Sequence, residues 1–145
     1  MPWKNGLGVT TEILIEPADA TLGNFDWRLS MARIDANGPF SSFPNIDRLL
    51  LVLEGRVNLQ IEGRPAVALT PDDAPIRFPG ELAVSATLIT APGALPRPAI
   101  DLNLISSSCG DGGKFFFIFR DIIAVWARGF CLHDDLVDQC QGAAL

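Results

Sequence analysis

Hydrophobic and polar residues alternate with a period of two along much of the first hundred positions, a pattern typical of half-buried β-strands. The segment 26–34, DWRLSMARI, places its large apolar side chains on one face and Arg28 and Ser30 on the other. Further strands are expected over residues 9–15, 49–53, 57–61, 66–69, 76–78, 83–89 and 101–105. Short strands separated by glycine and proline predict an all-β, antiparallel sandwich or barrel.

The turns and connections divide the chain into a core and a C-terminal segment. Gly55 lies between the strands expected over 49–53 and 57–61, and a glycine-containing turn at this place predicts a β-hairpin. Residues 91–98 are rich in proline, glycine and alanine and predict a connection. We therefore expect a β core over residues 1–105 and a divergent segment over residues 106–145.

Composition and charge exclude several classes of function. The 145 residues fit one domain, and the formal net charge of −6 argues against non-specific nucleic-acid binding. The most apolar stretch, residues 115–127, contains Arg120 and Asp121 and is shorter than the about 20 residues of a membrane span. The N-terminal residues show no apolar region of a signal peptide. We expect a cytoplasmic protein that associates with no membrane.

The residues that usually carry metal or nucleophilic chemistry are few. His133 is the only histidine, whereas catalytic metal sites generally use two or three. Cys109, Cys131 and Cys140 form no CxxC pair, so neither a zinc site nor a disulfide framework is indicated. We expect no metal, no cofactor and no catalytic nucleophile.

Three cations lie in settings that favour recognition of an anion. Lys4 and Arg48 lie beside turn residues, and Arg28 lies in the middle of an expected strand. The planar guanidinium group of arginine matches a carboxylate, and lysine adds a point charge. A solvent-facing Arg28 is the structural alternative. If the sheet is covered on that face, however, Arg28 and Ser30 line a cavity.

A series of short motifs gives the chain a family resemblance. In order, they are PWKNG (2–6), TTEI (10–13), WRLSMA (27–32), GPFSSFP (38–44), IDR (46–48), LEG (53–55), FPG (78–80) and DLN (101–103). Together they resemble the HutD/Ves family of bacterial proteins. The resemblance implies a cupin-like β-barrel, usually with two cupin units in one chain. It also implies an association with histidine utilisation, in which members are regarded as binders of a small metabolite.

The chain departs from the cupin pattern in two respects. Beyond Leu104 the second cupin unit is not recognisable, which suggests a shortened two-cupin chain with an incomplete second unit in residues 106–145. Pro44 and Ile46 stand where a metal cupin has histidines, and Arg48 stands near the place of its carboxylate. A cavity of this kind is expected to hold a carboxylate on Arg48 in place of a metal.

These observations lead to three hypotheses. The first is a non-enzymatic binder of a small carboxylate, such as urocanate or a formylglutamate-like acid, linked to the regulation of histidine utilisation. Strand alternation and the family motifs together indicate the ligand-binding residues Lys4, Asn5, Thr11, Arg28, Ser30, Arg48 and Asn103. In the empty state Glu12 or Asp47 could pair with the cations, which would make the group a structural ion-pair network.

The second hypothesis is a metal-free cupin enzyme that acts on a small organic acid. Glu12, Asp47 or Asp101 would then serve as the general base. The third is a structural stub, in which the divergent C-terminal segment leaves the barrel open and the protein works only by contact with a partner. Assembly into a homo-oligomer is a separate possibility. Turnover of a pathway intermediate by the purified protein distinguishes the second hypothesis from the first.

Overall fold

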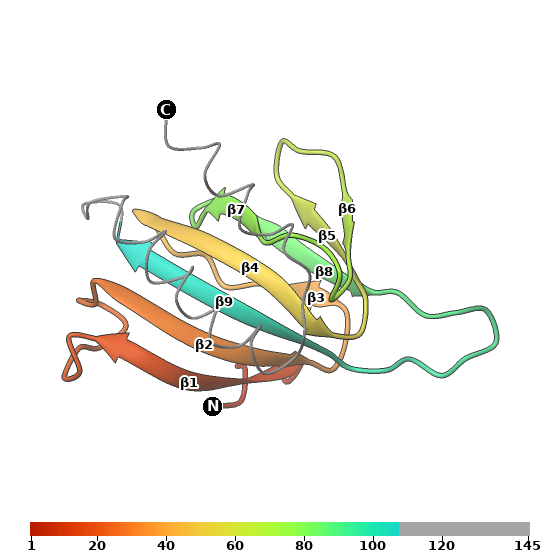
Figure 1. Cartoon of the computed structure of the whole chain (residues 1–145), viewed down its shortest axis with the longest axis horizontal. Coiled ribbons are helices and arrows are strands. Elements are labelled where there is room, and N and C mark those ends of the chain that lie inside the picture. Colours follow the sequence, from red (N-terminus) through yellow and green to blue (C-terminus); the bar gives the residue numbers. More distant parts are fainter. Residues whose placement is uncertain (108–145) are drawn as a thin grey trace. The chain divides into compact units, whose positions relative to one another are not determined.

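The computed structural model describes residues 1–107, which form two sheets of antiparallel strands (Figure 1). The five-stranded sheet contains, in spatial order, β1 (Gly8–Glu16), β2 (Trp27–Ile34), β9 (Ala99–Ser107), β4 (Ile46–Glu54) and β7 (Ile76–Pro79). The four-stranded sheet contains β3 (Gly38–Pro39), β8 (Val84–Leu88), β5 (Val57–Ile61) and β6 (Val67–Leu69). The expectation of an all-β, antiparallel architecture is confirmed for this part of the chain.

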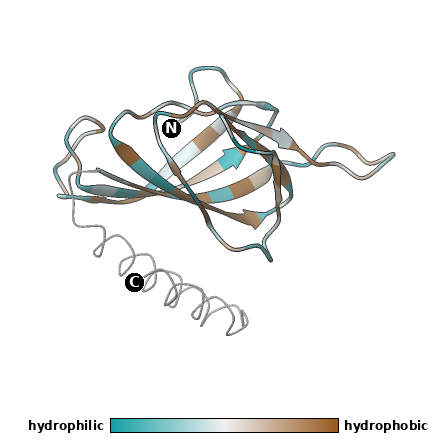
Figure 2. Cartoon of the chain, turned by 90° about the horizontal axis from the view of Figure 1, so that it is seen from above, coloured by the Kyte–Doolittle hydropathy of each residue, from teal (hydrophilic) through white to brown (hydrophobic). Residues whose placement is uncertain are grey.

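Strand alternation predicted most of the elements. Each expected strand is present, with ends that shift by up to three residues, and only the two-residue β3 was not expected. The bands of hydrophilic and hydrophobic colour that alternate along the strands in Figure 2 reflect the same pattern. The connection expected over residues 91–98 is also present, between β8 and β9.

The predicted hairpin at Gly55 is wrong, because β4 and β5 belong to different sheets. β4 pairs with β7 and β9, whereas β5 pairs with β6 and β8. Gly55 has a φ of 81°, and a Cβ atom there would meet the Ala99 Cα at 3.0 Å. Gly55 therefore lets the chain pass from one sheet to the other in close contact with the first residue of β9. Strand alternation alone does not reveal this crossing.

The hydrophobic core lies between the two sheets. Leu50 of β4 and Phe78 of β7 contribute from the five-stranded sheet, and Leu59 and Ile61 of β5 contribute from the other sheet. Each of these four side chains is at most 1% exposed. Because this core fills only part of the space between the sheets, the remaining inward-facing positions of β2, β4 and β9 are available for polar residues.

The sequence-based expectations for residues 108–145 lie outside the described residues. They concern the second cupin unit, the apolar stretch 115–127, His133 and the cysteines. β9 itself continues to Ser107, two residues past the expected end of the β core. Within residues 1–107, no helix has the length and apolar character to cross a membrane.

Candidate functional site

A cavity of about 440 Å³ opens beside the core, on the inward face of the five-stranded sheet. Its walls come from the N-terminal segment, from β1, β2, β4 and β9, and from the loop after β3. The predicted ligand-binding residues that line it are Lys4, Asn5, Arg28, Ser30, Arg48 and Asn103. The sequence thus identified most of the polar wall of one cavity.

Strand register explains why these side chains meet. Arg28 on β2 and Arg48 on β4 both pair with Ile105 of the intervening β9, so the two arginines occupy one row across the sheet. Ser30 and Asn103 are paired in the next row. Because side chains two residues apart share a face of a strand, all these polar groups point toward the cavity. Arg28 is 6% exposed, which excludes the solvent-facing alternative for this residue.

Thr11 does not line the cavity. Thr11 is exposed on β1 and pairs with Met31 of β2. Because the residues on either side of Met31 line the cavity, Met31 and its partner Thr11 lie on the opposite face of the sheet. Thr10 lines the cavity instead, and its hydroxyl oxygen accepts a hydrogen bond from the indole nitrogen of Trp3 at 2.7 Å. Residues 9–15 lack a regular alternation of apolar and polar positions, so the sequence did not determine which threonine faces inward.

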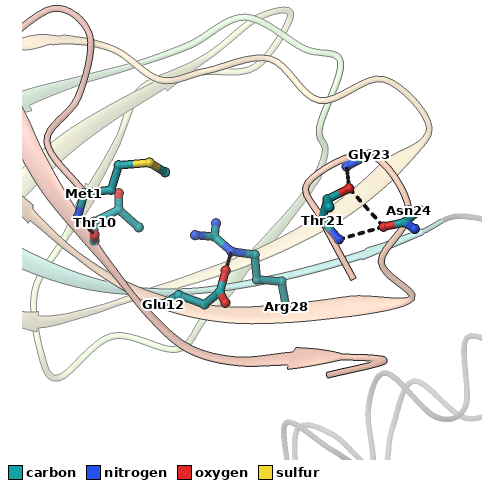
Figure 3. A network of polar contacts seen from close by, with 7 residues as sticks. All are labelled: Met1, Thr10, Glu12, Thr21, Gly23, Asn24 and Arg28. Carbon is teal, nitrogen blue, oxygen red and sulfur yellow. Dashed lines mark hydrogen bonds and ion pairs between the residues drawn. The ribbon is translucent and has the colours of Figure 1, made fainter. Parts of the chain in front are cut away.

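Arg28 is held by a carboxylate from the neighbouring strand. Its Nε donates to Glu12 Oε2 at 2.8 Å, and the rest of the guanidinium group extends beyond this ion pair (Figure 3). The Glu12 side chain is 45% exposed, whereas the Arg28 side chain is 8% exposed. Of the two carboxylates expected to pair with the cations, Glu12 therefore does so with Arg28. This ion pair engages the Nε edge of the Arg28 guanidinium group.

Arg48 is enclosed by aromatic rings. Its guanidinium carbon lies 5.5 Å from the ring centre of Phe40, 5.6 Å from that of Phe43 and 5.3 Å from that of Phe78. These distances are within the range of cation–π attraction. The three rings come from β7 and from the segment between β3 and β4, so they fix the position of the guanidinium group without neutralising its charge.

The hydrogen-bond acceptors of Arg48 are neutral. Nε and Nη2 each donate to Asn103 Oδ1 at 3.4 Å, and Nη1 donates to the Ser41 backbone oxygen at 3.0 Å. Burial lowers the pKa of Arg48 to about 10, and the nearby Asp101 carboxyl group partly opposes this shift. Arg48 thus remains a cation at neutral pH, and within residues 1–107 no ion pair neutralises it.

Asp101 is the carboxylate in the wall of the cavity. It lies two residues before Asn103 on β9 and is 1% exposed. Both of its oxygens are buried and lack a hydrogen bond of ordinary geometry among the described residues, although the backbone amide of Ala32 lies close enough to stabilise the charged form. Burial raises its pKa from 3.8 to about 7, and the charge of Arg48 and the backbone amide of Ala32 limit this rise. A carboxyl group buried with so little hydrogen bonding is unusual in a folded protein.

The other two candidate bases lie elsewhere. Asp47 faces away from the cavity, where its Oδ2 accepts a hydrogen bond from Arg77 Nη2 at 2.9 Å. Glu12 is the partner of Arg28. Among the three carboxylates considered from the sequence, Asp101 is the one that the structure places in the cavity wall.

The N-terminal segment forms the rim of the cavity. Lys4 and Asn5 lie in an exposed turn that continues through Gly6, which has a φ of 71°. Asn5 Oδ1 accepts a hydrogen bond from the Leu7 backbone amide at 3.0 Å, so this oxygen stabilises the turn. Lys4 and the amide nitrogen of Asn5 are among the groups that this segment can offer to a ligand.

The described residues do not fit a metal centre of the kind that cupin folds often hold. No group of three His, Cys, Asp or Glu residues in 1–107 is arranged to bind an ion. Asp101 is the one such residue that the described part of the chain places in the cavity wall, and Arg48 contributes a positive charge nearby. A divalent cation would therefore meet one carboxylate and a competing guanidinium group, an unfavourable ligand set.

The aromatic enclosure of Arg48 and the burial of Asp101 were not predicted from the sequence. Phe40 and Phe43 belong to the GPFSSFP motif (38–44), but only the folded chain brings them and Phe78 around Arg48. Asp101 was considered only as a base. Its spacing of two from Asn103 was the available signal, because that spacing puts both side chains on one face of β9.

Comparisons with known proteins agree on the family. The HutD family model matches residues 1–109. A 21.2 kDa protein of Pseudomonas putida, described as uncharacterized and in the hutC 3′ region, is 43% identical over 106 residues, with 72% of this chain and 52% of the relative covered. Protein Ves of Citrobacter koseri is 37% identical over 105 residues, with 72% and 51% covered. The chain spans about half the length of these curated relatives.

Solved structures agree on the fold. HutD from Pseudomonas fluorescens SBW25 is 42% identical, with a TM-score of 0.64 over 74% of this chain and 54% of that one. A cupin domain of a transcriptional regulator of the XRE family from Enterobacter cloacae is 18% identical, with a TM-score of 0.53 over 69% of this chain and 96% of that one. The latter likeness concerns the fold alone. The described part of the chain has a cupin-like all-β fold.

Proposed function

The chain belongs to the HutD family, and from this premise we propose that its cavity binds a small carboxylate metabolite of histidine utilisation in the cytoplasm without transforming it. Urocanate and formylglutamate-like acids are the candidate ligands. The hutC region in which the Pseudomonas putida relative is placed supports the link to this pathway. Binding would then report the level of a pathway intermediate and thereby regulate the pathway.

The observation that carries this proposal is the environment of Arg48. Buried charges in proteins are usually paired with an opposite charge, because removal from water is costly. Arg48 is 6% exposed, and within residues 1–107 its hydrogen bonds go only to neutral oxygens of Asn103 and Ser41. A ligand carboxylate would complete this site, since a guanidinium group binds a carboxylate through strong charge-assisted hydrogen bonds.

The other cations support the same ligand class. Arg28 lies in the same row of the sheet as Arg48, and its ion pair with Glu12 leaves both Nη groups toward the cavity (Figure 3). Lys4 lies at the rim. With Asp101 partly protonated near neutral pH, the cavity wall carries an excess of positive charge although the whole chain is acidic. Such a local field attracts small anions.

The size and chemistry of the cavity favour binding over turnover. A volume of about 440 Å³ is within the range of small-molecule sites. Among residues 1–107, the wall includes no histidine, cysteine or glutamate, so the groups there that could act as nucleophiles or bases are the serine and threonine hydroxyls, the amino groups of Met1 and Lys4, and Asp101. Glu12 and Asp47, two of the bases considered for an enzyme, already form ion pairs with arginines.

A thermal-shift screen of the full chain against the acids of histidine degradation tests this proposal. Urocanate or N-formylglutamate is expected to raise the melting temperature, because a ligand that binds only the folded state stabilises it. Arg48→Gln should abolish the shift. The control Arg33→Gln removes an exposed arginine, paired with Asp35, from the same sheet and should leave the shift unchanged. Consumption of either acid by the purified protein would instead establish the enzyme hypothesis.

A further inference from the structure

Two polar side chains in the cavity wall carry hydrogen-bonding groups that have no partner among residues 1–107. Ser30 of β2 and Asn103 of β9 are 4% and 7% exposed, and both line the cavity. Asn103 Oδ1 accepts hydrogen bonds from Arg48, but in the described part of the chain Asn103 Nδ2 and the Ser30 hydroxyl take part in none. Because buried polar groups are normally hydrogen-bonded, these two groups are expected to meet a ligand.

Both groups are reachable from the cavity. Within residues 1–107, the side-chain nitrogen and oxygen atoms that are sealed and also lack a hydrogen bond of ordinary geometry are the two Asp101 oxygens. The unpaired groups of Ser30 and Asn103 are therefore not sealed. Since both side chains line the cavity, their accessible atoms face it.

Strand pairing places the two groups side by side. Ser30 and Asn103 are direct partners across β2 and β9, and the Cβ atoms of such partners lie about 4.5–5.5 Å apart. The Asn103 oxygen is engaged by Arg48, so its amide offers N–H donors to the cavity, and the Ser30 hydroxyl offers an O–H donor. One ligand oxygen is thus able to accept a hydrogen bond from each of them.

The same pair lies next to the proposed carboxylate site. Asn103 Oδ1 is 3.4 Å from both Nε and Nη2 of Arg48, and Nδ2 is bonded to the same amide carbon as Oδ1. Toward Asn103 and Ser41, Arg48 uses three of its five N–H donors, which leaves two for a ligand carboxylate. A ligand held there brings atoms about three or four bonds from its carboxylate carbon within hydrogen-bond reach of Ser30 and Asn103.

We propose that Ser30 and Asn103 together bind a carbonyl oxygen of the ligand, and that the cavity selects small acids with a keto, acyl or amide carbonyl about three bonds from the carboxylate carbon. This inference rests on the proposed function, because the carboxylate on Arg48 sets the position of the rest of the ligand. It adds a neutral recognition point and narrows the ligand class. An analogue with an apolar group in place of the carbonyl oxygen leaves two buried donors unpaired and is disfavoured.

The test uses two acids of the same charge and similar shape, 4-oxopentanoate and 4-methylpent-4-enoate. The first has a carbonyl oxygen where the second has a CH₂ group. Isothermal titration calorimetry with the full chain at pH 7.5 is expected to show binding of the keto acid about 10-fold tighter or more, because two neutral hydrogen bonds are gained. An apolar wall would give the opposite order, since the methylene acid is the more hydrophobic of the two.

Substitutions identify the groups responsible. Ser30→Ala removes one donor, leaves the hydrogen bonds of Arg48 intact, and should reduce the preference for the keto acid to about threefold. Asn103→Leu removes the other donor and a contact of Arg48, so both acids should bind more weakly and the preference should be lost. Ser106→Ala, at a serine of β9 that does not line the cavity, should change neither affinity nor preference. A melting curve of each variant confirms that it is folded.

The ratio of the two affinities separates this inference from the proposed function. A loss of Arg48 positioning alone weakens both acids alike and leaves the ratio unchanged. If the natural chain binds both acids equally, or the methylene acid more tightly, and Arg48→Gln weakens both, the carboxylate site stands and the carbonyl subsite is refuted. If the preference persists in Ser30→Ala and Asn103→Leu, another donor binds the carbonyl and the inference fails.

Titration of urocanate and N-formylglutamate in the same experiment covers the remaining outcome. If neither test acid binds but one of these two does, the inference is wrong and the proposed function stands. If none of the four acids binds, both the inference and the proposed function are contradicted.

Discussion

Asp101→Asn is expected to make the folded chain more stable than the natural protein at neutral and alkaline pH. The folded state raises the pKa of Asp101 from 3.8 to about 7, mainly through burial. Between these two values the folded chain binds more protons than the unfolded chain. The free energy of unfolding therefore decreases as the pH rises through this window, and the loss is complete above about pH 7. Asparagine does not titrate and avoids this loss.

The pKa shift sets the size of the effect. A shift from 3.8 to about 7 corresponds to about 4 kcal/mol of stability over the full window, at 1.36 kcal/mol for each unit. The attraction of Arg48 is already part of that pKa, since it limits the rise. About 2 kcal/mol of the difference develops between pH 5.5 and pH 8.5. The other ionisable groups are common to both proteins, so their contributions cancel in the comparison.

Urea denaturation of both full-length proteins at several values between pH 5.5 and 8.5 measures this difference. Asp101→Asn should gain about 2 kcal/mol relative to the natural chain across that range. The range stays above pH 5.5 because an acidic chain loses its net charge, and with it solubility, in more acidic solution. A difference that does not vary with pH, or that grows in favour of the natural chain at high pH, would refute the account of Asp101.

Three further predictions concern the site, the core and the metal content. Arg28→Ala should remove measurable binding of a pathway acid in calorimetry, a loss of about 2–5 kcal/mol, while urea unfolding stays cooperative; unchanged affinity would exclude Arg28 from the site. Leu59→Ala should lower the free energy of unfolding by about 2–5 kcal/mol, because Leu59 is fully buried in the core, and a loss below 1 kcal/mol would contradict that packing. Elemental analysis of protein purified without added metal should find no stoichiometric zinc, iron or manganese, and one equivalent of any of them would overturn the metal-free expectation.

The positions of the strands could be predicted because each depends on local alternation and on turn residues. β5 was placed at its observed ends, since its apolar and polar residues alternate strictly between Arg56 and Glu62. The partners of the strands could not be predicted in the same way. Gly55 indicated a reversal of the chain, but packing against Ala99 decides that the chain changes sheets there.

The candidate site was predicted in part for a similar physical reason. The shared face of Arg28 and Ser30 follows from the period of two. The sequence did not show whether that face points inward, because the opposite face of the strand carries large apolar side chains that could equally pack in the core. The row that brings Arg28 and Arg48 together depends on β9, which is distant in sequence from both strands. The ring enclosure of Arg48 similarly depends on three segments that meet only in the fold.

The most direct test of the central claim is a calorimetric titration of the full chain with an acid and with its neutral amide. Urocanate or N-formylglutamate is expected to bind, and its carboxamide should bind at least about 30-fold more weakly, because the amide cannot neutralise the buried guanidinium group. Arg48→Gln should weaken binding of the acid by a similar factor and remove the difference between acid and amide. Equal affinity for acid and amide, or absence of binding by both acids, would contradict the proposal that this cavity recognises a carboxylate.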